Sequence, residues 1–128
     1  MARILVVEDN AANLTLATFL LESVGHSVLS AKNAEAGLAC ARAEHPDLIL
    51  MDIQLPGMDG LEATALLKRD AATREIPVIA LTALAMMGDE TRILAAGCDG
   101  YIAKPMQYKA FLATVQAHLL GMEPRHST

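Results

Sequence analysis

The sequence predicts an α/β fold in which five parallel strands form one doubly wound sheet with helices on both faces. Short apolar segments alternate with longer segments whose apolar residues have helical spacing, which is typical of successive strand–helix units. Several of the short segments are apolar throughout, as expected for parallel strands that are covered on both sides. Because crossovers between parallel strands are right-handed, this pattern favours a single doubly wound sheet.

The predicted strands are the short apolar segments at residues 4–7, 28–29, 48–51, 78–81 and 101–102. Together with the helices between them they account for the chain as far as about residue 121. A length of 128 residues suits one domain and leaves little room for a second. We therefore expect one domain over residues 1–121, followed by a short polar C-terminal tail over residues 122–128.

The first two predicted helices have clear start and stop signals. The first begins near Asn10, a good N-cap residue, and ends at Gly25. The second covers residues 33–44 and stops before Pro46. The apolar face of the first helix consists of Leu14, Ala17, Leu21 and Val24.

The other three helices are marked in the same way. The third begins at Asp59, where Glu62 can complete a capping box, and ends before Ile76. The fourth covers about residues 88–96, with Gly97 as its C-terminal cap. The fifth has apolar residues at helical spacing and closes at Gly121. These residues are Tyr108, Phe111, Leu112, Val115 and Leu119, and we expect all of them, including Tyr108, on the core side.

Composition excludes several classes of function. The chain has 10 basic and 15 acidic side chains, a net charge of −5, and shows no basic patch, so we expect no nucleic-acid partner. No apolar run is long enough to span a membrane, and the N-terminus lacks the apolar core of a signal peptide, so we expect no membrane partner and a cytoplasmic location.

Cys40 and Cys98 are expected to be reduced and largely buried thiols. The four histidines form no metal-binding pair and are expected on the solvated surface (His26, His45, His118 and His126).

Chemically active side chains follow the strands at the points where the strands end. Glu8 and Asp9 follow the first strand, and Asp52 follows the third. Thr82 follows the fourth and Lys104 the fifth. Since ligands of open α/β sheets bind beyond the carboxyl ends of the strands, we expect these side chains to meet at one edge.

Such a cluster predicts a Mg²⁺ site. Carboxylates held close together repel one another, by roughly 4 kcal/mol per pair at ~4 Å and an effective dielectric constant of ~20, so they require protons, a lysine or a bound cation. Hard oxygen ligands suit Mg²⁺, and a carboxylate beside Mg²⁺ can attack a phosphoryl group and hold it as an acyl phosphate. Taken singly, each residue has a plainer interpretation: a helix cap for Asp52 or Thr82, or a solvated surface lysine for Lys104. Their joint position at one edge favours the site.

These residues resemble the signature of the response-regulator receiver domain, the phosphoacceptor of two-component signalling. The resemblance rests on Glu8-Asp9, Met51-Asp52, Thr82-Ala83 and Lys104-Pro105 and covers nearly the whole chain. It implies a flavodoxin-like sheet with strand order 2-1-3-4-5. It also implies a histidine kinase or histidine phosphotransfer protein as phosphodonor and a downstream protein as target, with no enzymatic activity beyond self-catalysed phosphoryl transfer and autodephosphorylation.

The resemblance also assigns roles. It implies that Asp52 is phosphorylated and that Asp9 and Asp52 bind Mg²⁺ directly, while Glu8 acts through water and Gln54 offers its backbone carbonyl. Lys104 and Thr82 would contact the phosphoryl oxygens, and Thr82 would act as the switch together with Tyr101. The bond before Pro105 would be a cis peptide. Two departures are small: the acidic pair is Glu-Asp where some members have Asp-Asp, and Gln54 occupies a position where other side chains occur.

Alternatives remain at this point. The chain could be a receiver-fold binding module that works without phosphate, or the receiver fragment of a hybrid histidine kinase. Phosphatases of the haloacid dehalogenase type also use an Asp after a strand, but they need a second Asp two positions later, where this chain has Gln54. A flavodoxin-like cofactor protein would need a phosphate-binding loop, which is not evident.

Two interaction surfaces are expected. The output surface should lie on the fourth helix, the fifth strand and the fifth helix. The candidate contacts are Met86, Met87, Met106 and Tyr108, although the helical spacing of Tyr108 favours the core for this residue. The phosphodonor should dock on the first helix. The residues expected on its exposed face are Asn10, Ala11, Leu14 and Thr18.

Overall fold

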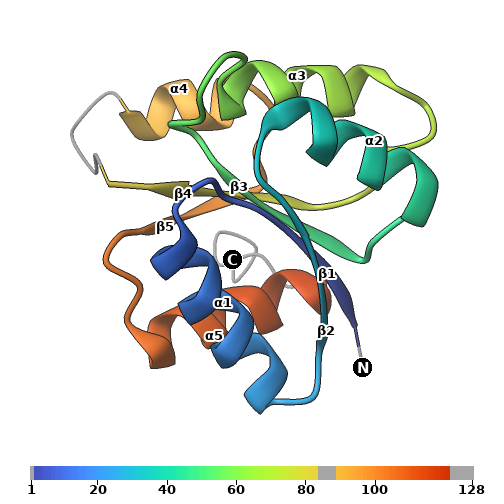
Figure 1. The fold of residues 1–128 in the computed structure, drawn as a ribbon. Helices are drawn as coiled ribbons and strands as arrows, with labels where there is room; N and C mark the ends of the chain where they lie inside the picture. The colour runs from blue at the N-terminus through green and yellow to red at the C-terminus, as the bar shows by residue number, and fades with distance from the viewer. Residues whose placement is uncertain (1, 84–88, 122–128) are drawn as a thin grey trace, which may run out of the picture.

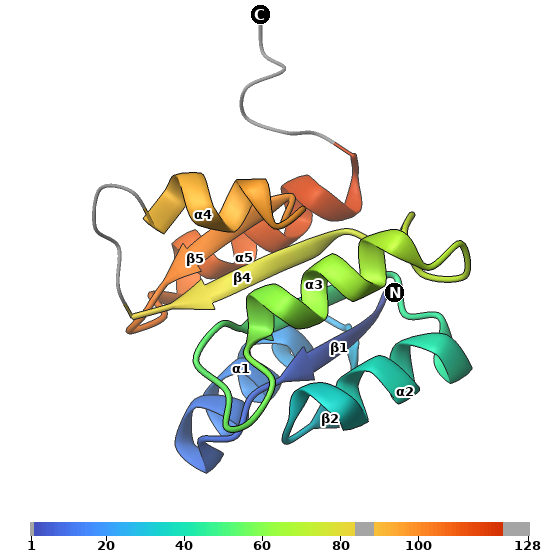
Figure 2. The same ribbon diagram turned by 90° about the horizontal axis from the view of Figure 1, so that it is seen from above.

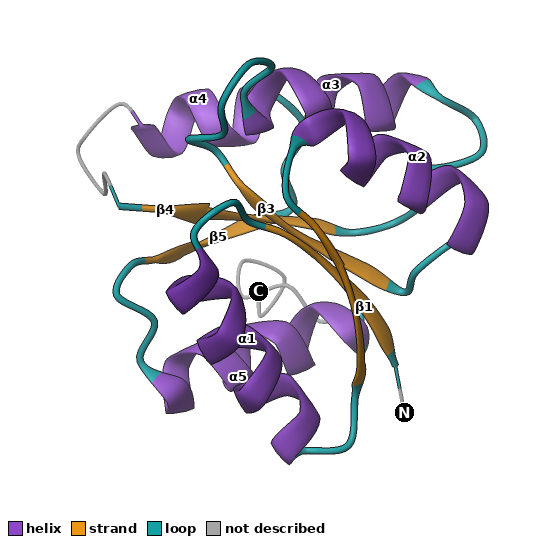
Figure 3. Cartoon of the chain, in the orientation of Figure 1, coloured by secondary structure: helices purple, strands orange, loops and turns teal. Residues whose placement is uncertain are grey.

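A computed structural model, which describes residues 2–83 and 89–121, has the predicted architecture. Its five-stranded sheet has the order β2-β1-β3-β4-β5, and every pairing is parallel (Figures 1 and 3). The strands are β1 (Arg3–Val7), β2 (Ser27–Ala31), β3 (Leu48–Asp52), β4 (Val78–Thr82) and β5 (Gly100–Ala103). The helices are α1 (Ala11–Ser23), α2 (Ala34–Glu44), α3 (Gly60–Arg69), α4 (Asp89–Ala95) and α5 (Tyr108–Leu119). The fold prediction and its strand order are confirmed.

The sheet lies between two helical layers, with α2, α3 and α4 on one face and α1 and α5 on the other (Figures 1 and 2). Alternate residues of each central strand enter opposite layers. In β1, Leu5 and Val7 pack toward α2 and α3, whereas Ile4 and Val6 pack toward α1 and α5. Because β1, β3 and β4 have both faces covered, they are apolar at almost every position, and this is the pattern that predicted them.

Several boundaries differ from the prediction because local hydrogen bonds decide them. Helix α3 ends at Arg69, well before Ile76, since the Asp70 carboxylate accepts from the Ala72 N–H and starts a turn. The Thr73 hydroxyl then donates to the Leu67 carbonyl and closes the end of the helix. The predicted start of the fourth helix at residue 88 lies outside the described residues.

Three expectations about side-chain burial are wrong. Val24 is 49% exposed because α1 ends at Ser23, so Val24 is no longer on its apolar face. Tyr108 is 57% exposed because it opens α5, and the apolar face of this helix begins one turn later, at Phe111. Met106, an expected surface contact, is instead part of the core. Met86 and Met87 lie outside the described residues.

His118 is also buried, contrary to the surface location expected for the histidines. Its Nδ1 lies 2.9 Å from the Thr114 carbonyl and its Nε2 lies 3.1 Å from the Asp99 carbonyl. The last turn of α5 approaches β5 at Gly100, where a Cβ would lie 2.8 Å from Nε2 of His118. The absence of a side chain at Gly100 therefore makes room for the ring.

Both cysteines are free thiols, as expected; Cys98 is buried and Cys40 is half-buried. Burial raises the pKa of the Cys98 thiol above its usual value. Within residues 2–83 and 89–121, no helix has the length and apolar character needed to cross a membrane.

A lysine-centred network joins α3 to the amino ends of β4 and β5. The Lys68 ammonium lies 3.0 Å from a carboxylate oxygen of Asp99 and 2.8 Å from the Ile76 carbonyl. The same Asp99 oxygen accepts from the backbone N–H of Val78 at 2.8 Å. The positive charge of Lys68 is therefore paired with the negative charge of Asp99 at this edge of the sheet.

Lys68→Met should lower the free energy of unfolding by about 1–3 kcal/mol, because Asp99 and a partly buried carbonyl lose their donor while the aliphatic stem is kept. Urea unfolding followed by circular dichroism measures the change. The matched control is Lys109→Met on the exposed face of α5, which should change stability much less. Equal losses in the two variants would contradict this role for Lys68.

Candidate functional site

The strand register places the predicted site residues at one edge of the sheet. Val7 pairs with Met51, so Glu8, the next residue along the chain, lies beside Asp52. Asp52 pairs with Leu81, and Thr82 pairs with Ala103. Lys104 follows directly, and its N–H donates to the Thr82 carbonyl at 2.8 Å. The residues that the sequence places at four strand ends therefore converge, as predicted from strand order and polarity.

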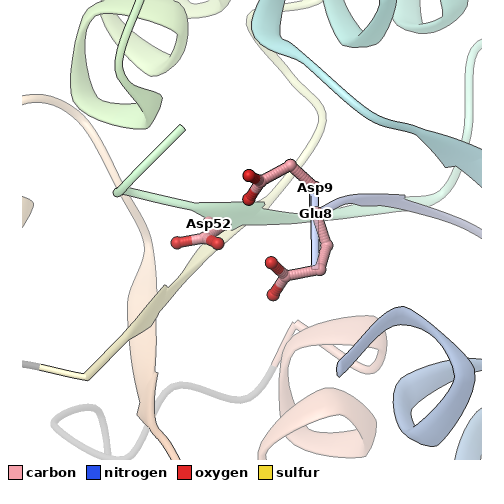
Figure 4. A group of neighbouring side chains, drawn as sticks. All are labelled: Glu8, Asp9 and Asp52. Carbon is pink, nitrogen blue, oxygen red and sulfur yellow. The ribbon is translucent and has the colours of Figure 1, made fainter. Parts of the chain in front are cut away.

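The acidic residues Glu8, Asp9 and Asp52 form a close cluster (Figure 4). One carboxylate oxygen from each lies within 4.8 Å of the others. Glu8 and Asp52 are buried, whereas Asp9 is exposed, so the cluster opens to solvent on the Asp9 side. Oxygen ligands with one solvent-facing side suit Mg²⁺, which keeps several waters and uses few carboxylates.

Asp52 is held by two donors from different parts of the chain. Its Oδ1 accepts from the backbone N–H of Gln54 at 2.9 Å, which ties the carboxylate to the loop after β3. Its Oδ2 accepts from the Lys104 ammonium at 3.0 Å. The rotamer of Asp52 is therefore fixed before any ligand binds.

Lys104 bridges the two buried acids. Its ammonium lies 3.0 Å from Asp52 and 2.9 Å from Oε1 of Glu8. Burial by itself lowers the pKa of Lys104, but the contacts with Glu8 and Asp52 outweigh it and raise the pKa above its usual value. Lys104 is therefore a firmly protonated cation at the centre of the site.

Glu8 is a buried acid whose pKa lies above its usual value despite the contact with Lys104. Burial is the main cause that raises its pKa, and the neighbouring Asp52 adds to it, while Lys104 and the Asn10 N–H oppose the rise. The Lys104 contact to Oε1 lacks hydrogen-bond geometry, and Oε1 has no other hydrogen-bond partner among the described residues. A buried oxygen in this state fits a role as acceptor for a metal-bound water. One lysine opposes three acids here, and the residues present fit a divalent cation.

The remaining predicted residues lie near the cluster. Thr82 ends β4 and is 1% exposed. Tyr101 lies on β5, is 37% exposed and pairs with Ala80. The side chain of Gln54 is exposed, and the Lys104-Pro105 peptide bond is cis.

Two contributions to the site were missed from the sequence. The backbone N–H of Asn10 donates to Oε2 of Glu8, a contact that the expected roles of Asn10 as helix cap and docking residue do not include. Gly60, which begins α3, lies against the backbone of Asp52, and no residue-type signal marks this contact. The short separation between Glu8 and Asn10 could have suggested the first contact, but only coordinates show the second.

The sequence matches the response regulator receiver domain family over residues 4–116. The chain belongs to this family. It is 47% identical over 116 residues to the polar-differentiation response regulator DivK of Brucella ovis, and the match covers 91% of this chain and 94% of that protein. The DivK of Brucella anthropi matches equally well in identity and coverage. The chain is thus a DivK-like response regulator of two-component signalling, and its expected family resemblance is confirmed.

Solved receiver structures are close in fold. The receiver domain of the sensor histidine kinase PA1611 of Pseudomonas aeruginosa, which has a magnesium ion coordinated in its active-site cleft, is 37% identical with a TM-score of 0.84, and covers 94% of this chain and 98% of that chain. The chemotaxis response regulator CheY4 of Vibrio cholerae is 26% identical with a TM-score of 0.86, and covers 91% and 97%. The match of a receiver domain over most of the chain also separates it from the phosphatase and flavodoxin-like cofactor interpretations.

The raised pKa of Glu8 generates a pH prediction for the metal-free protein. The folded state binds a proton on Glu8 above the ordinary value of 4.5, so Glu8 lowers the free energy of unfolding as pH rises from 4.5 through the folded-state pKa. Glu8→Gln removes this term, so the stability of the variant relative to wild type should increase as pH rises from 4.5 through the folded-state pKa of Glu8.

Urea unfolding in EDTA measures this difference, and the exposed Glu35→Gln provides the control. Addition of Mg²⁺ should stabilise wild type by about 2.7 kcal/mol at a hundredfold excess over Kd. This should narrow the difference in free energy of unfolding between Glu8→Gln and wild type. If the stability of Glu8→Gln relative to wild type instead falls with rising pH in EDTA, the contact with Lys104, and not burial, determines the pKa of Glu8.

Proposed function

We propose that Asp52 accepts a phosphoryl group from a phosphohistidine of a histidine kinase or histidine phosphotransfer protein, in a Mg²⁺-dependent reaction. The observation that carries the proposal is the Asp52 carboxylate held between the Gln54 N–H and the Lys104 ammonium, beside Glu8 and Asp9. An oriented carboxylate is a competent nucleophile, and no deprotonation step is needed before attack. A complete set of acids and lysine also favours phosphorylation over a phosphate-independent binding module.

In this proposal, one oxygen of Asp52 forms a bond to phosphorus while the phosphorus–nitrogen bond of the donor breaks and its electron pair returns to the imidazole. Asp9, Asp52 and the backbone carbonyl of Gln54 would bind Mg²⁺ directly, and Glu8 would act through water. When bound, Mg²⁺ supplies charge neutralisation at the transferring oxygens. Lys104 is already at the nucleophile and can follow the phosphoryl oxygens as their charge develops.

The proposed product is an aspartyl phosphate, and its loss by hydrolysis is the second self-catalysed step. The exposed side chain of Gln54 is placed two residues beyond Asp52 and can approach an attacking water, so we propose that it tunes this step. We also propose that residues 1–121 form the receiver domain, with residues 122–128 as a tail, and that the protein acts in the cytoplasm on a downstream protein.

The proposed switch depends on Thr82 more than on Lys104. Phosphorylation adds about −1.5 to −2 charges, and hydrogen bonds to charged groups contribute about 1.5–3 kcal/mol each. Moving a two-state equilibrium from 1:99 to 99:1 requires about 5.5 kcal/mol. Lys104 already contacts Asp52 in the unphosphorylated protein, so its gain is reduced. We propose that Thr82 is the more discriminating partner, and Tyr101 on the adjacent strand is placed to respond.

The proposed docking surface for the phosphodonor needs one adjustment. Asn10 and Ala11 are exposed as expected, but Leu14 and Thr18 are partly buried, and Leu14 packs against the core. The outward face of α1 instead includes Leu16 and Phe19, and Phe19 is 67% exposed.

Asp52→Asn should abolish phosphorylation. Wild type incubated with acetyl phosphate and Mg²⁺ should gain the mass of one phosphoryl group, which hydroxylamine removes and EDTA prevents from forming. Asp47→Asn, at the opposite edge of the sheet, should be labelled like wild type. Wild type that stays unlabelled, or an Asp52→Asn protein that is labelled equally, would contradict the proposed function.

Thr82→Ala should accept the phosphoryl group within about tenfold of the wild-type rate but lose most of the conformational response. The rate is followed by intact mass, and the response by the change in amide chemical shifts of β5 and α5 on phosphorylation. The proposed switch predicts large shifts at Tyr101 in wild type and small shifts in the variant. Equal shifts in both proteins would argue against a switching role for Thr82.

A further inference from the structure

We propose that Gly60 is a positioning residue for Asp52, and that the missing side chain at the start of α3 sets where the phosphoacceptor carboxylate lies. This inference rests on the proposed function, because it concerns the position of the residue that function uses. The geometry assigns the role: the first residue of α3 lies directly against the peptide bond that joins Asp52 to Ile53.

The approach of Gly60 to this peptide leaves no space for a side chain. A Cβ on Gly60 would lie 2.1 Å from the carbonyl oxygen of Asp52 and 2.7 Å from Cα of Ile53. Both neighbours are backbone atoms, one in the last residue of β3 and one in the residue after it, so no side-chain rotation relieves the overlap. A methyl group here would require a displacement of about 1 Å of either α3 or the end of β3.

Gly60 is held in this position from both sides. Its N–H donates to the Ile53 carbonyl at 3.3 Å, across the loop that follows β3. The preceding residue, Asp59, caps α3 and forms a capping box with Glu62. The helix start and the end of β3 are therefore joined by direct contacts, and a shift in one displaces the other.

A second support comes from inside the helix. The hydroxyl of Thr64, which is fully buried, donates to the Gly60 carbonyl at 2.8 Å. The same hydroxyl lies 3.7 Å from the sulfur of Cys98, just before β5. Thr64 thus connects Gly60, which lies against the backbone of Asp52, to the interior between α3 and β5.

A displacement at Gly60 matters for chemistry because the other side of Asp52 is the site. The carboxylate is held by the Gln54 N–H at 2.9 Å and by Lys104 at 3.0 Å, and it shares the acidic cluster with Asp9. Hydrogen bonds weaken steeply when a partner moves by about 1 Å, and residues that orient metal ligands affect metal affinity by about 10–100-fold. If Gly60 served only for close packing, its substitution would lower stability and leave the Mg²⁺ affinity of the folded protein unchanged.

The test compares Gly60→Ala with a matched glycine at the other edge of the sheet. Gly100→Ala places a Cβ 2.8 Å from the His118 ring, an overlap with a buried side chain far from the acidic cluster. For each protein, the Mg²⁺ dissociation constant is measured by NMR titration without a phosphodonor. The rate of labelling by acetyl phosphate at saturating Mg²⁺ and the free energy of unfolding are also measured.

The expected result is a Mg²⁺ dissociation constant at least about tenfold higher in Gly60→Ala, with slower labelling at saturation. Gly100→Ala should lose stability and keep both values within about twofold of wild type. Wild-type Mg²⁺ affinity and labelling rate in a folded Gly60→Ala protein would overturn the proposal. Equal losses in the two variants would also overturn it, since they would follow from destabilisation alone.

If Gly60→Ala does not fold, variants of Thr64 test whether Gly60 positions Asp52. Thr64→Val removes the hydroxyl that holds the Gly60 carbonyl but keeps the shape, and Thr64→Ser keeps the hydroxyl. The proposal predicts a few-fold weaker Mg²⁺ binding in Thr64→Val and recovery in Thr64→Ser. Wild-type Mg²⁺ binding in Thr64→Val would overturn it. Wild type serves as the separate reference: if wild type binds no Mg²⁺ and accepts no phosphoryl group, the proposed function fails first.

Discussion

The structure depends on a charge imbalance that the sheet holds in place. Glu8, Asp9 and Asp52 lie within one small region, and Lys104 forms ion pairs with the two buried acids. Two like charges at ~4 Å repel by roughly 4 kcal/mol at an effective dielectric constant of ~20. The acids remain together because their strands are paired and buried, so the backbone cannot relax to separate them. The electrostatic conflict is therefore relieved by a proton, by Lys104 or by a bound cation.

The opposite edge of the sheet is arranged differently. There Lys68 forms an ion pair with Asp99, and Arg3 forms one with Glu44 at 2.6 Å. Asp99 also accepts from the backbone of Val78, which fixes the amino end of β4. Natural proteins break local rules mainly at functional sites, and here the unmatched charge is concentrated at the carboxyl edge while the amino edge provides stability.

Much of the fold and of the site could be predicted from the sequence, because both follow from local pattern. Strands buried on both faces, such as β3, are apolar at nearly every residue, and the strand-end rule then brings Asp52 to the same edge as Glu8. The burial of His118 and the exposure of Tyr108 could not be predicted, since both depend on how α5 lies against β5. The imbalance at Glu8 likewise depends on burial and on the distance to Lys104, and neither can be read from residue order.

Gly60 illustrates a different limit of sequence reasoning. A glycine after a capping aspartate indicates a helix start, and nothing in its chemistry indicates that the absent side chain is what lets the helix touch Asp52. The same contact bears on how a charge change at Asp52 spreads. The backbone of Asp52 is backed by α3, and β4 and β5 are fixed at their amino ends by Lys68 and Asp99. Thr82 and Lys104 lie at the opposite, carboxyl ends of these strands, where the proposed switch would respond to added charge.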